Sequence, residues 1–210
     1  IVDKTMNDFK GHISTGLVGA QWLMRTLSHN GRADIAYHLA TDTTYPSWGY
    51  MVKNGATTIW ELWNGNTADP AMNSGNHVML LGDLLVWFYE DRAGIKSDSI
   101  ETGFKKIVMR PVPVNGLSHV KASYHSVHGL ISSEWKTENE IFDWNITVPA
   151  NTTALVAVPA KDAAEVTESG KKAADSEGVK FLRMDGDRAV FEIGSGTYDF
   201  VSKNFRSKEF

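Results

Sequence analysis

The spacing of hydrophobic residues changes once along this chain of 210 residues, and the change divides the sequence into two parts. Before Gly94 the apolar residues recur three or four positions apart, which is the spacing of one face of an α-helix. After Lys96 apolar and polar residues alternate, which is the pattern of a half-buried β-strand. The sequence therefore predicts a helical part followed by a β part.

Helices and one loop-rich segment are predicted in the first part. Ser14 or Thr15 is positioned to cap the first helix, and Asn30-Gly31 is positioned to end it. The apolar face of this helix is formed by Ile13, Leu17, Ala20, Met24 and Leu27. The later segments are expected to be a helix over Arg32–Ala40, a loop over Thr43–Thr57, a short helix around Thr58–Trp63, and a helix over Asn76–Asp91 that Gly94 ends. The predicted apolar stripe of the last helix is Val78, Leu81, Leu85 and Phe88.

The second part has the pattern of an antiparallel β-sandwich. Turn-forming residues separate about eight short alternating runs, and no helix is expected between them. The clearest run has an apolar face of Phe142, Trp144, Ile146 and Val148. The predicted fold class is therefore an α plus all-β chain in two parts, with residues 1–96 forming helices and residues 97–204 forming the sandwich.

Composition excludes several classes of function. The formal net charge is −4 and no basic run occurs, so nucleic acid is not an expected partner. The chain has no cysteine, which excludes disulfides and thiolate metal sites but leaves the compartment open. The longest apolar run, Val78–Val86, is interrupted and too short to span a membrane. The sequence begins at Ile1 without a Met or a signal-peptide pattern, and we expect it to be cut from a longer polypeptide.

Chemically informative residues are most concentrated in the segment Gly55–Gly65. Glu61 lies there between Trp60 and Trp63 in an otherwise uncharged setting, and Trp48 precedes the segment. Aromatic rings stack on the apolar faces of sugars, and a carboxylate beside them can activate water or accept hydrogen bonds from hydroxyl groups. The alternative is that Glu61 is an ordinary helix residue and that the Trp side chains fill a core. The pattern alone leaves both interpretations open.

Histidines provide a second group of candidates. His77 follows Asn76 at the expected start of a helix, a position that suits a neutral, hydrogen-bonding imidazole. A histidine that is satisfied by backbone groups is the alternative. His125 and His128 have no further ligand at metal-binding spacing, so no metal site is predicted. The sequence also lacks a phosphate-binding loop and a nucleophile elbow, and no cofactor is expected.

Several segments of the sequence resemble bacterial α-L-rhamnosidases. The most recognisable are Tyr45–Met51 and Gly55–Glu61, and Asn73-Ser74 with Asn76-His77 resembles the segment that follows them. Thr15–Gly19 is similar to the start of a helix in the same family. Segments similar to its C-terminal sandwich include Ile107–Pro111, Ala122–Tyr124, Val148–Ala154 and Gly194–Tyr198. The resemblance covers nearly the whole chain.

The resemblance implies the last helices of an (α/α)6 barrel, a C-terminal β-sandwich, and an enzyme that releases terminal α-L-rhamnose with inversion. It implies that Glu61 is the general base, that His77 contacts the sugar, and that Trp60 and Trp48 line the pocket. An inverting hydrolase needs two carboxyl groups about 6.5–9.5 Å apart, one that protonates the leaving oxygen and one that activates water. The family's general acid belongs to an earlier acidic motif that these residues do not contain. We therefore expect this chain to depend on the rest of the catalytic barrel for the acid.

The sequence also departs from the family pattern. The family has Arg and Asp where this sequence has Leu62 and Asn64, and it has an aromatic residue where this sequence has Val78. Glu61 itself is present, so the departures affect the surroundings of the predicted base. They leave room for a different sugar preference.

Three other interpretations fit the sequence besides a rhamnosidase. One is a carbohydrate-binding module without catalytic activity, in which the Trp side chains form a stacking platform. Another is a related (α/α)6 glycosidase with another sugar specificity. The third is an interaction fragment whose open helical face pairs with a second chain. Loss of Glu61 would leave binding intact in the first case, and the measured mass would depend on concentration in the third.

Overall fold

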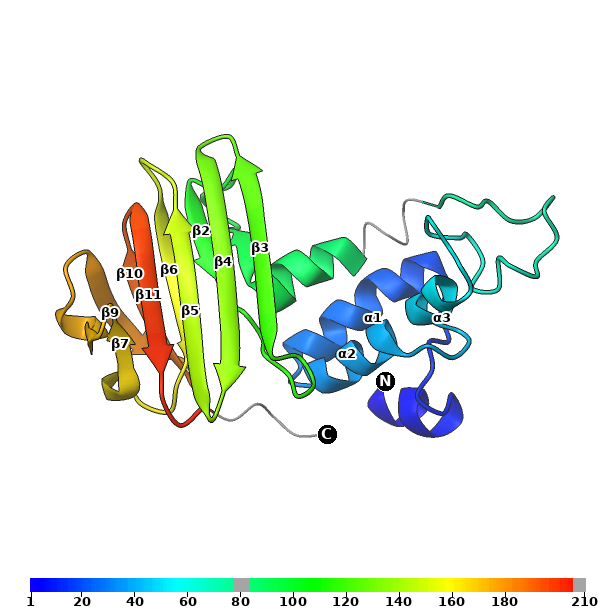
Figure 1. The fold of residues 1–210 in the computed structure, drawn as a ribbon, viewed down its shortest axis with the longest axis horizontal. Helices are drawn as coiled ribbons and strands as arrows, with labels where there is room; N and C mark the ends of the chain where they lie inside the picture. The colour runs from blue at the N-terminus through cyan, green and yellow to red at the C-terminus, as the bar shows by residue number, and fades with distance from the viewer. Residues whose placement is uncertain (78–83, 206–210) are drawn as a thin grey trace. The chain divides into compact units, whose positions relative to one another are not determined.

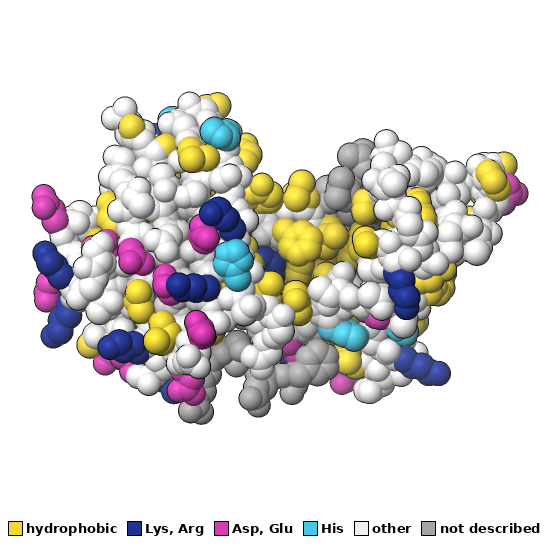
Figure 2. Space-filling model, viewed as in Figure 1, with side chains coloured by type: hydrophobic (Ala, Val, Ile, Leu, Met, Phe, Trp, Pro, Cys, Tyr) yellow, Lys and Arg dark blue, Asp and Glu magenta, His cyan; other side chains and the backbone are white. Residues whose placement is uncertain are grey.

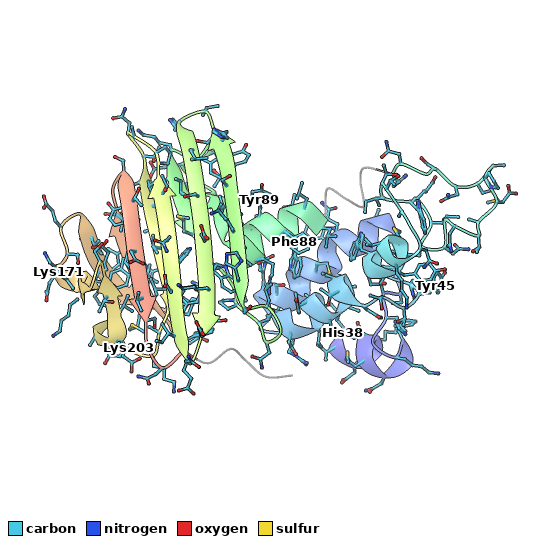
Figure 3. All side chains as sticks on the ribbon, in the orientation of Figure 1. His38, Tyr45, Phe88, Tyr89, Lys171 and Lys203 are labelled. Atoms are coloured by element: carbon cyan, nitrogen blue, oxygen red, sulfur yellow. The ribbon has the colours of Figure 1, made fainter. Side chains whose placement is uncertain are left out.

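The computed structural model describes residues 1–77 and 84–205, which form two compact units. The first runs from Ile1 to Phe88 and is called the helical unit here; the second begins at Tyr89 and is called the sandwich unit. Phe88 and Tyr89 are both labelled in Figure 3. The predicted succession of helices and a two-sheet β part is confirmed. The domain boundaries expected from the sequence, residues 1–96 and residues 97–204, stay a prediction.

Three α-helices of the helical unit are described over their full length (Figure 1): α1 (Leu17–His29), α2 (Ala33–Thr41) and α3 (Trp48–Lys53). They follow a π-helix over Lys4–Asp8. The predicted apolar face of α1 is confirmed for the members whose burial is described, which are Ile13, Ala20, Met24 and Leu27. Together with side chains of α2 and Trp87 they form the core of this unit. Within that core the Trp87 indole N–H donates to the Ser28 hydroxyl at 2.8 Å.

The start of α1 differs from the prediction. Its N-cap is Gly16, and no side chain accepts a hydrogen bond there, so neither Ser14 nor Thr15 caps the helix. The Thr15 side chain instead packs against Gly19, where an added Cβ would lie 2.6 Å from the Thr15 Cβ. The predicted end is confirmed, because Asn30 is the C-cap and its backbone N–H bonds to carbonyl oxygens of the last turn.

Helix α3 lies inside the segment that was predicted to be a loop. Ser47 caps it, because the Ser47 Oγ accepts a hydrogen bond from the Tyr50 N–H at 2.9 Å. Tyr45, labelled in Figure 3, precedes the cap, and its ring meets that of Tyr50 edge-on at 5.5 Å between centroids. The glycines and Pro46 of this segment favour a loop, but one turn and a half of helix fits between the Ser cap and Asn54.

The short helix predicted around Thr58–Trp63 is absent, and residues 54–77 are irregular (Figure 1). Their backbone hydrogen bonds explain the difference. The N–H groups of Glu61 and Leu62 bond to residues twelve or so positions later in the chain instead of to the preceding turn. Pairing with a distant segment therefore replaces local helical bonds.

The last predicted helix is described only in part. Asn76 and His77 are not helical, and Val78 and Leu81 lie outside the described residues. Residues 84–87 are helical and continue into a π-helix over Phe88–Ala93, which ends before Gly94. The predicted stripe is wrong for its described members, since Leu85 and Phe88 are 47% and 39% exposed. Leu84 and Trp87 form the buried face instead.

The sandwich unit contains two sheets. The five-stranded sheet has the order β1 (Ile95–Ser97), β2 (Lys106–Met109), β6 (Thr153–Pro159), β10 (Arg188–Ile193) and β9 (Val179–Met184). The six-stranded sheet has the order β3 (His119–Ser126), β4 (Gly129–Glu138), β5 (Ile141–Val148), β11 (Gly196–Ser202), β7 (Val166–Glu168) and β8 (Lys171–Lys172). All strand pairs given for these residues are antiparallel except β2 with β6, which is parallel.

The core of this unit lies between the two sheets. The alternation predicted for β5 is confirmed, because Phe142, Trp144, Ile146 and Val148 are each at most 2% exposed. Figure 2 shows basic and acidic side chains interspersed over the outer face of the six-stranded sheet. Among these, Lys136 pairs with Asp143 at 3.1 Å across β4 and β5. The strand thus has one apolar face and one solvated face, as a two-layer sandwich requires.

None of the helices in the described ranges has the length and apolar character needed to cross a membrane.

Candidate functional site

Two irregular segments of the helical unit, residues 58–62 and 73–77, run antiparallel to each other. Each contributes donors and acceptors to the other, so neither needs a regular helix or strand to satisfy its backbone. The bonds run from the His77 N–H to the Ile59 carbonyl at 2.6 Å, from the Glu61 N–H to the Ser74 carbonyl at 2.9 Å, and from the Thr58 hydroxyl to the Gly75 carbonyl. This pairing places Trp60, Glu61 and His77, three of the predicted site residues, on adjoining backbone.

The carboxylate of Glu61 is exposed and held at one oxygen. Its Oε2 accepts a hydrogen bond from the Ser74 N–H at 2.9 Å. Within the part of the chain that the structure describes, the other oxygen has no hydrogen-bond partner. A carboxylate in this arrangement is oriented by the protein through Oε2 and is able to accept a proton or a hydrogen bond through Oε1.

Trp60 directly precedes Glu61 in the sequence, and its side chain is half-buried. The position of this side chain depends on a glycine. An added Cβ at Gly65 would lie 2.7 Å from the Trp60 Cβ and Cγ. No side chain larger than hydrogen fits at that position without displacing the indole. The turn that follows Glu61 therefore packs directly against the Trp60 side chain.

Trp63 connects the same turn to the helical core. Its indole N–H donates to the Thr15 carbonyl at 3.0 Å. Its ring meets the ring of Trp48 edge-on, with centroids 5.1 Å apart and an interplanar angle of 85°. The turn after Glu61 is thus fixed to the start of α1 and to α3.

Trp48 belongs to α3 and is buried, with 3% of its surface exposed. It packs in the core of the helical unit, and its link to the Glu61 segment is the contact with Trp63. Its indole N–H is buried without a hydrogen-bond partner in the described residues. A buried unpartnered donor is uncommon in proteins and calls for an explanation.

The carboxylate of Asp42 fixes the loop that precedes α3. The His12 Nδ1 lies 3.0 Å from the Asp42 Oδ2, and the N–H and hydroxyl of Thr44 donate to the Asp42 Oδ1 at 2.9 and 2.7 Å. Burial raises the pKa of Asp42, but the bonds from Thr44 and the charge and bond of His12 outweigh it, so the pKa is lowered overall. The Asp42 carbonyl in turn accepts a hydrogen bond from the Ser47 hydroxyl at 2.5 Å.

Comparison with known proteins shows which family the chain belongs to. Residues 2–91 match the family model described as the bacterial alpha-L-rhamnosidase 6 hairpin glycosidase domain. Residues 94–173 match the bacterial alpha-L-rhamnosidase C-terminal domain. The chain belongs to the bacterial α-L-rhamnosidase family. The resemblance noted in the sequence is therefore confirmed, for both the helical and the β part.

Known α-L-rhamnosidases are similar over nearly all of the chain. An α-L-rhamnosidase of Streptomyces avermitilis is 36% identical over 195 residues, which are 90% of this chain and 18% of that protein. The crystal structure of the Streptomyces avermitilis enzyme complexed with L-rhamnose matches with a TM-score of 0.84 and 34% identity, over 94% of this chain and 19% of that one. The α-L-rhamnosidase structure from Dictyoglumus thermophilum matches with a TM-score of 0.85 and 32% identity, over 96% and 22%. The chain spans about a fifth of the length of these α-L-rhamnosidases.

The candidate site contains residues that the sequence did not single out as functional. In the sequence, Asn73 and Ser74 stand out only as part of a segment similar to the family, and Trp63 only as a neighbour of Glu61. Their contacts with residues 61 and 62, and with the start of α1, join positions far apart in the chain. No local pattern signals such contacts, and the available clue was that Asn73-Ser74 belongs to a segment that resembles the family. Among the described residues no group of three or more His, Asp or Glu residues is arranged to hold a metal ion.

Proposed function

We propose that this chain forms the last helices of the catalytic barrel and the sandwich of an inverting glycoside hydrolase that releases terminal α-L-rhamnose. The observation that carries the proposal is the Glu61 carboxylate, which is held at Oε2 by the Ser74 N–H and exposed at its other oxygen. It lies in a segment flanked by Trp60 and Trp63, in a chain of the α-L-rhamnosidase family. A fixed, exposed carboxylate in a segment rich in Trp suits a general base that acts on a sugar.

In this mechanism Glu61 accepts a proton from a water molecule as the water oxygen attacks the anomeric carbon. The bond between that carbon and the glycosidic oxygen breaks on the opposite face of the sugar, and a second carboxyl group protonates the leaving oxygen. One C–O bond forms on one face while the other breaks on the opposite face in a single displacement, so the configuration at the anomeric carbon inverts. The second carboxyl group comes from barrel residues that are not among these 210.

We assign contacts with the sugar to His77, Trp60 and Trp48. His77 and Trp60 are both half-buried and lie on the two paired segments that hold Glu61. Trp48 is 3% exposed and its buried indole N–H has no partner in the described residues, so we assign its contact with the sugar to a bridging water that accepts from this N–H. These three side chains are expected to set the affinity for the sugar, and Glu61 the rate of the chemical step.

The remainder of the catalytic barrel is the proposed partner of the helical unit. Val18 and Trp22 lie one helical turn apart on α1 and are 73% and 61% exposed. Leu85 adds a third large apolar side chain, which is 47% exposed. Helices with exposed apolar residues at this spacing need a packing surface. The additional length of the related α-L-rhamnosidases is consistent with helices that supply it.

The test is hydrolysis of an aryl α-L-rhamnoside by the natural polypeptide that contains this chain, compared with its Glu61→Gln variant. The substitution keeps the shape of the side chain and removes the base, and loss of a general base costs on the order of 10²–10⁴ in rate. Glu177→Gln is the matched control, because Glu177 is an exposed acid of the sandwich unit. NMR of the first-formed product should show the inverted anomer.

Each outcome points to one interpretation. Loss of activity in the Glu61 variant alone supports the proposal. Equal activity in both variants places the base elsewhere. Rhamnoside binding that survives Glu61→Gln, without turnover in the natural protein, favours the carbohydrate-binding module. Turnover of another glycoside in place of rhamnosides favours the related (α/α)6 glycosidase. The 210 residues by themselves should show no turnover, and measurable hydrolysis would contradict the dependence on an acid from elsewhere.

A further inference from the structure

Glu61 does not lie in a regular element, although a general base has to be held to within about 0.5 Å of its productive position. Residues 54–77 contain neither helix nor strand, so no ladder of regular backbone bonds fixes this carboxylate. Specific contacts from outside the segment have to do so. Such contacts lie on both sides of Glu61.

On one side, two consecutive residues bind the backbone and side chain of the Glu61 segment. The Ser74 carbonyl accepts the Glu61 N–H, and the Ser74 N–H donates to the Glu61 carboxylate, both at 2.9 Å. The Asn73 Oδ1 accepts the Leu62 N–H at 3.1 Å. Of these three bonds, the first two use the backbone of Ser74. The third bond is the one made by a side chain, that of Asn73, so a substitution can remove it.

On the other side, the turn after Glu61 is fixed by Trp63. The Gly65 N–H bonds to the Leu62 carbonyl at 3.0 Å, which closes a turn over residues 62–65. Trp63 in that turn donates to the Thr15 carbonyl. The Glu61–Leu62 peptide is therefore held at its own N–H by Asn73, and the residue that follows it, Trp63, is held by the Thr15 carbonyl. Without the bond to Asn73, only the two backbone bonds of Ser74 hold Glu61 in the described part of the chain, and the Glu61–Leu62 peptide and the carboxylate gain freedom to shift.

We infer that Asn73 is a positioning residue for Glu61: its side-chain carbonyl holds the Leu62 N–H and thereby keeps the Glu61 carboxylate in register with the Ser74 N–H. The inference rests on the proposed role of Glu61 as general base. Asn73 itself makes no proton transfer. Its effect is expected on the rate of the chemical step, because a displacement of about 1 Å at a catalytic group costs on the order of 10²-fold in rate.

The test compares Asn73→Ala with Asn73→Asp in the natural polypeptide that contains this chain. Asn73→Ala removes the acceptor, and kcat should fall by about 10- to 100-fold with little change in KM. Asn73→Asp keeps an oxygen acceptor at the same place and should recover most of kcat near neutral pH. Its added negative charge beside Glu61 should move the acid limb of the pH–rate profile to higher pH.

Asn66→Ala is the matched control. Asn66 lies in the same irregular segment and binds the Tyr50 hydroxyl and Asn54 instead of residues next to Glu61. The kcat of the Asn66→Ala variant should stay within about 3-fold of wild type. Thermal unfolding and circular dichroism of all variants report whether the segment still folds, and recovery by the Asp variant separates positioning from folding.

Two results would overturn the inference while Glu61 keeps its role. One is a wild-type kcat for Asn73→Ala. The other is an equal loss of kcat in the Ala and Asp variants with the pH–rate profile unchanged. Failure of the proposed function looks different, because Glu61→Gln would then retain activity whatever the Asn73 variants do.

Discussion

Ser133 is a buried hydroxyl that joins three parts of the sandwich unit. Its Oγ donates to the Ala93 carbonyl at 2.7 Å and accepts from the Trp144 indole N–H at 2.9 Å. Ser133 is 0% exposed, and so is Trp144. One hydroxyl therefore satisfies the end of the π-helix and a core indole of β5 at the same time. We predict that Ser133→Ala is among the more destabilising single-atom changes in this chain.

The expected size follows from the groups that the substitution leaves behind. Ala at this position removes the hydroxyl, and the Ala93 carbonyl and the Trp144 N–H both stay buried without it. A buried polar group without a partner costs about 1–3 kcal/mol. Partial relaxation and entry of water reduce the sum, so we expect a loss of about 2–4 kcal/mol in the free energy of unfolding of the sandwich unit.

The measurement is urea denaturation combined with native-state hydrogen exchange of the β4 and β5 amides. Exchange of these amides reports the sandwich unit separately from the helical unit, which global fluorescence would not do. Ser132→Ala is the control, because Ser132 is the neighbouring residue of β4 and points to the opposite face. It should change the unfolding free energy by less than about 0.5 kcal/mol.

A double-mutant cycle with Trp144→Phe isolates one of the two bonds. Phe keeps an aromatic ring in the core and removes the indole N–H. The coupling energy between Ser133→Ala and Trp144→Phe should be about 1 kcal/mol, the usual value for contacting residues that share a hydrogen bond. The reasoning is refuted if Ser133→Ala costs no more than Ser132→Ala, or if the cycle shows no coupling.

The remaining predictions concern a carboxylate and two glycines. Asp42→Asn should lower stability at neutral pH; because the pKa of Asp42 is lowered by folding, the wild type loses this advantage as pH falls through that pKa, and the urea midpoints of the two proteins should converge below about pH 4. A difference that is independent of pH would contradict the ionic contribution. Gly94→Ala should destabilise far more than Gly170→Ala: both glycines have positive φ (74° and 79°), but a Cβ at Gly94 would lie 2.2 Å from the Pro111 nitrogen, whereas nothing lies within 4 Å at Gly170. Gly170→Ala should cost about 1–2 kcal/mol and Gly94→Ala several times that, and equal urea midpoints would contradict the clash.

The period of the hydrophobic pattern predicted a large share of the fold. Strand β5 alternates because successive side chains of a strand point to opposite faces, and its four apolar residues are all buried. The same reasoning holds for α1, whose buried residues recur at helical spacing. These features depend on geometry within one element, and the sequence of that element carries all the information needed.

The candidate site was predicted in its residues but not in its geometry. Glu61 and Trp60 were predicted from a segment of unusual composition, His77 from a second segment, and all three from the resemblance of these segments to α-L-rhamnosidases. The segment around Glu61 was expected to be helical, and it pairs with residues 73–77 instead. Helix propensity describes only bonds to the preceding turn, so it cannot weigh them against a partner segment twelve or more residues away.

Tertiary structure also decided which apolar side chains are buried. Trp48 is packed in the helical core and Trp22 is 61% exposed, although both are Trp residues in apolar helical surroundings. On the last helix Leu84 and Trp87 are buried, whereas Leu85 and Phe88 of the predicted stripe are exposed. The sequence by itself determined the two-part architecture, the strand faces and the identity of the candidate base. Only the folded chain determined where that base is held, because its hydrogen-bond partners come from segments that are distant in sequence and adjacent in space.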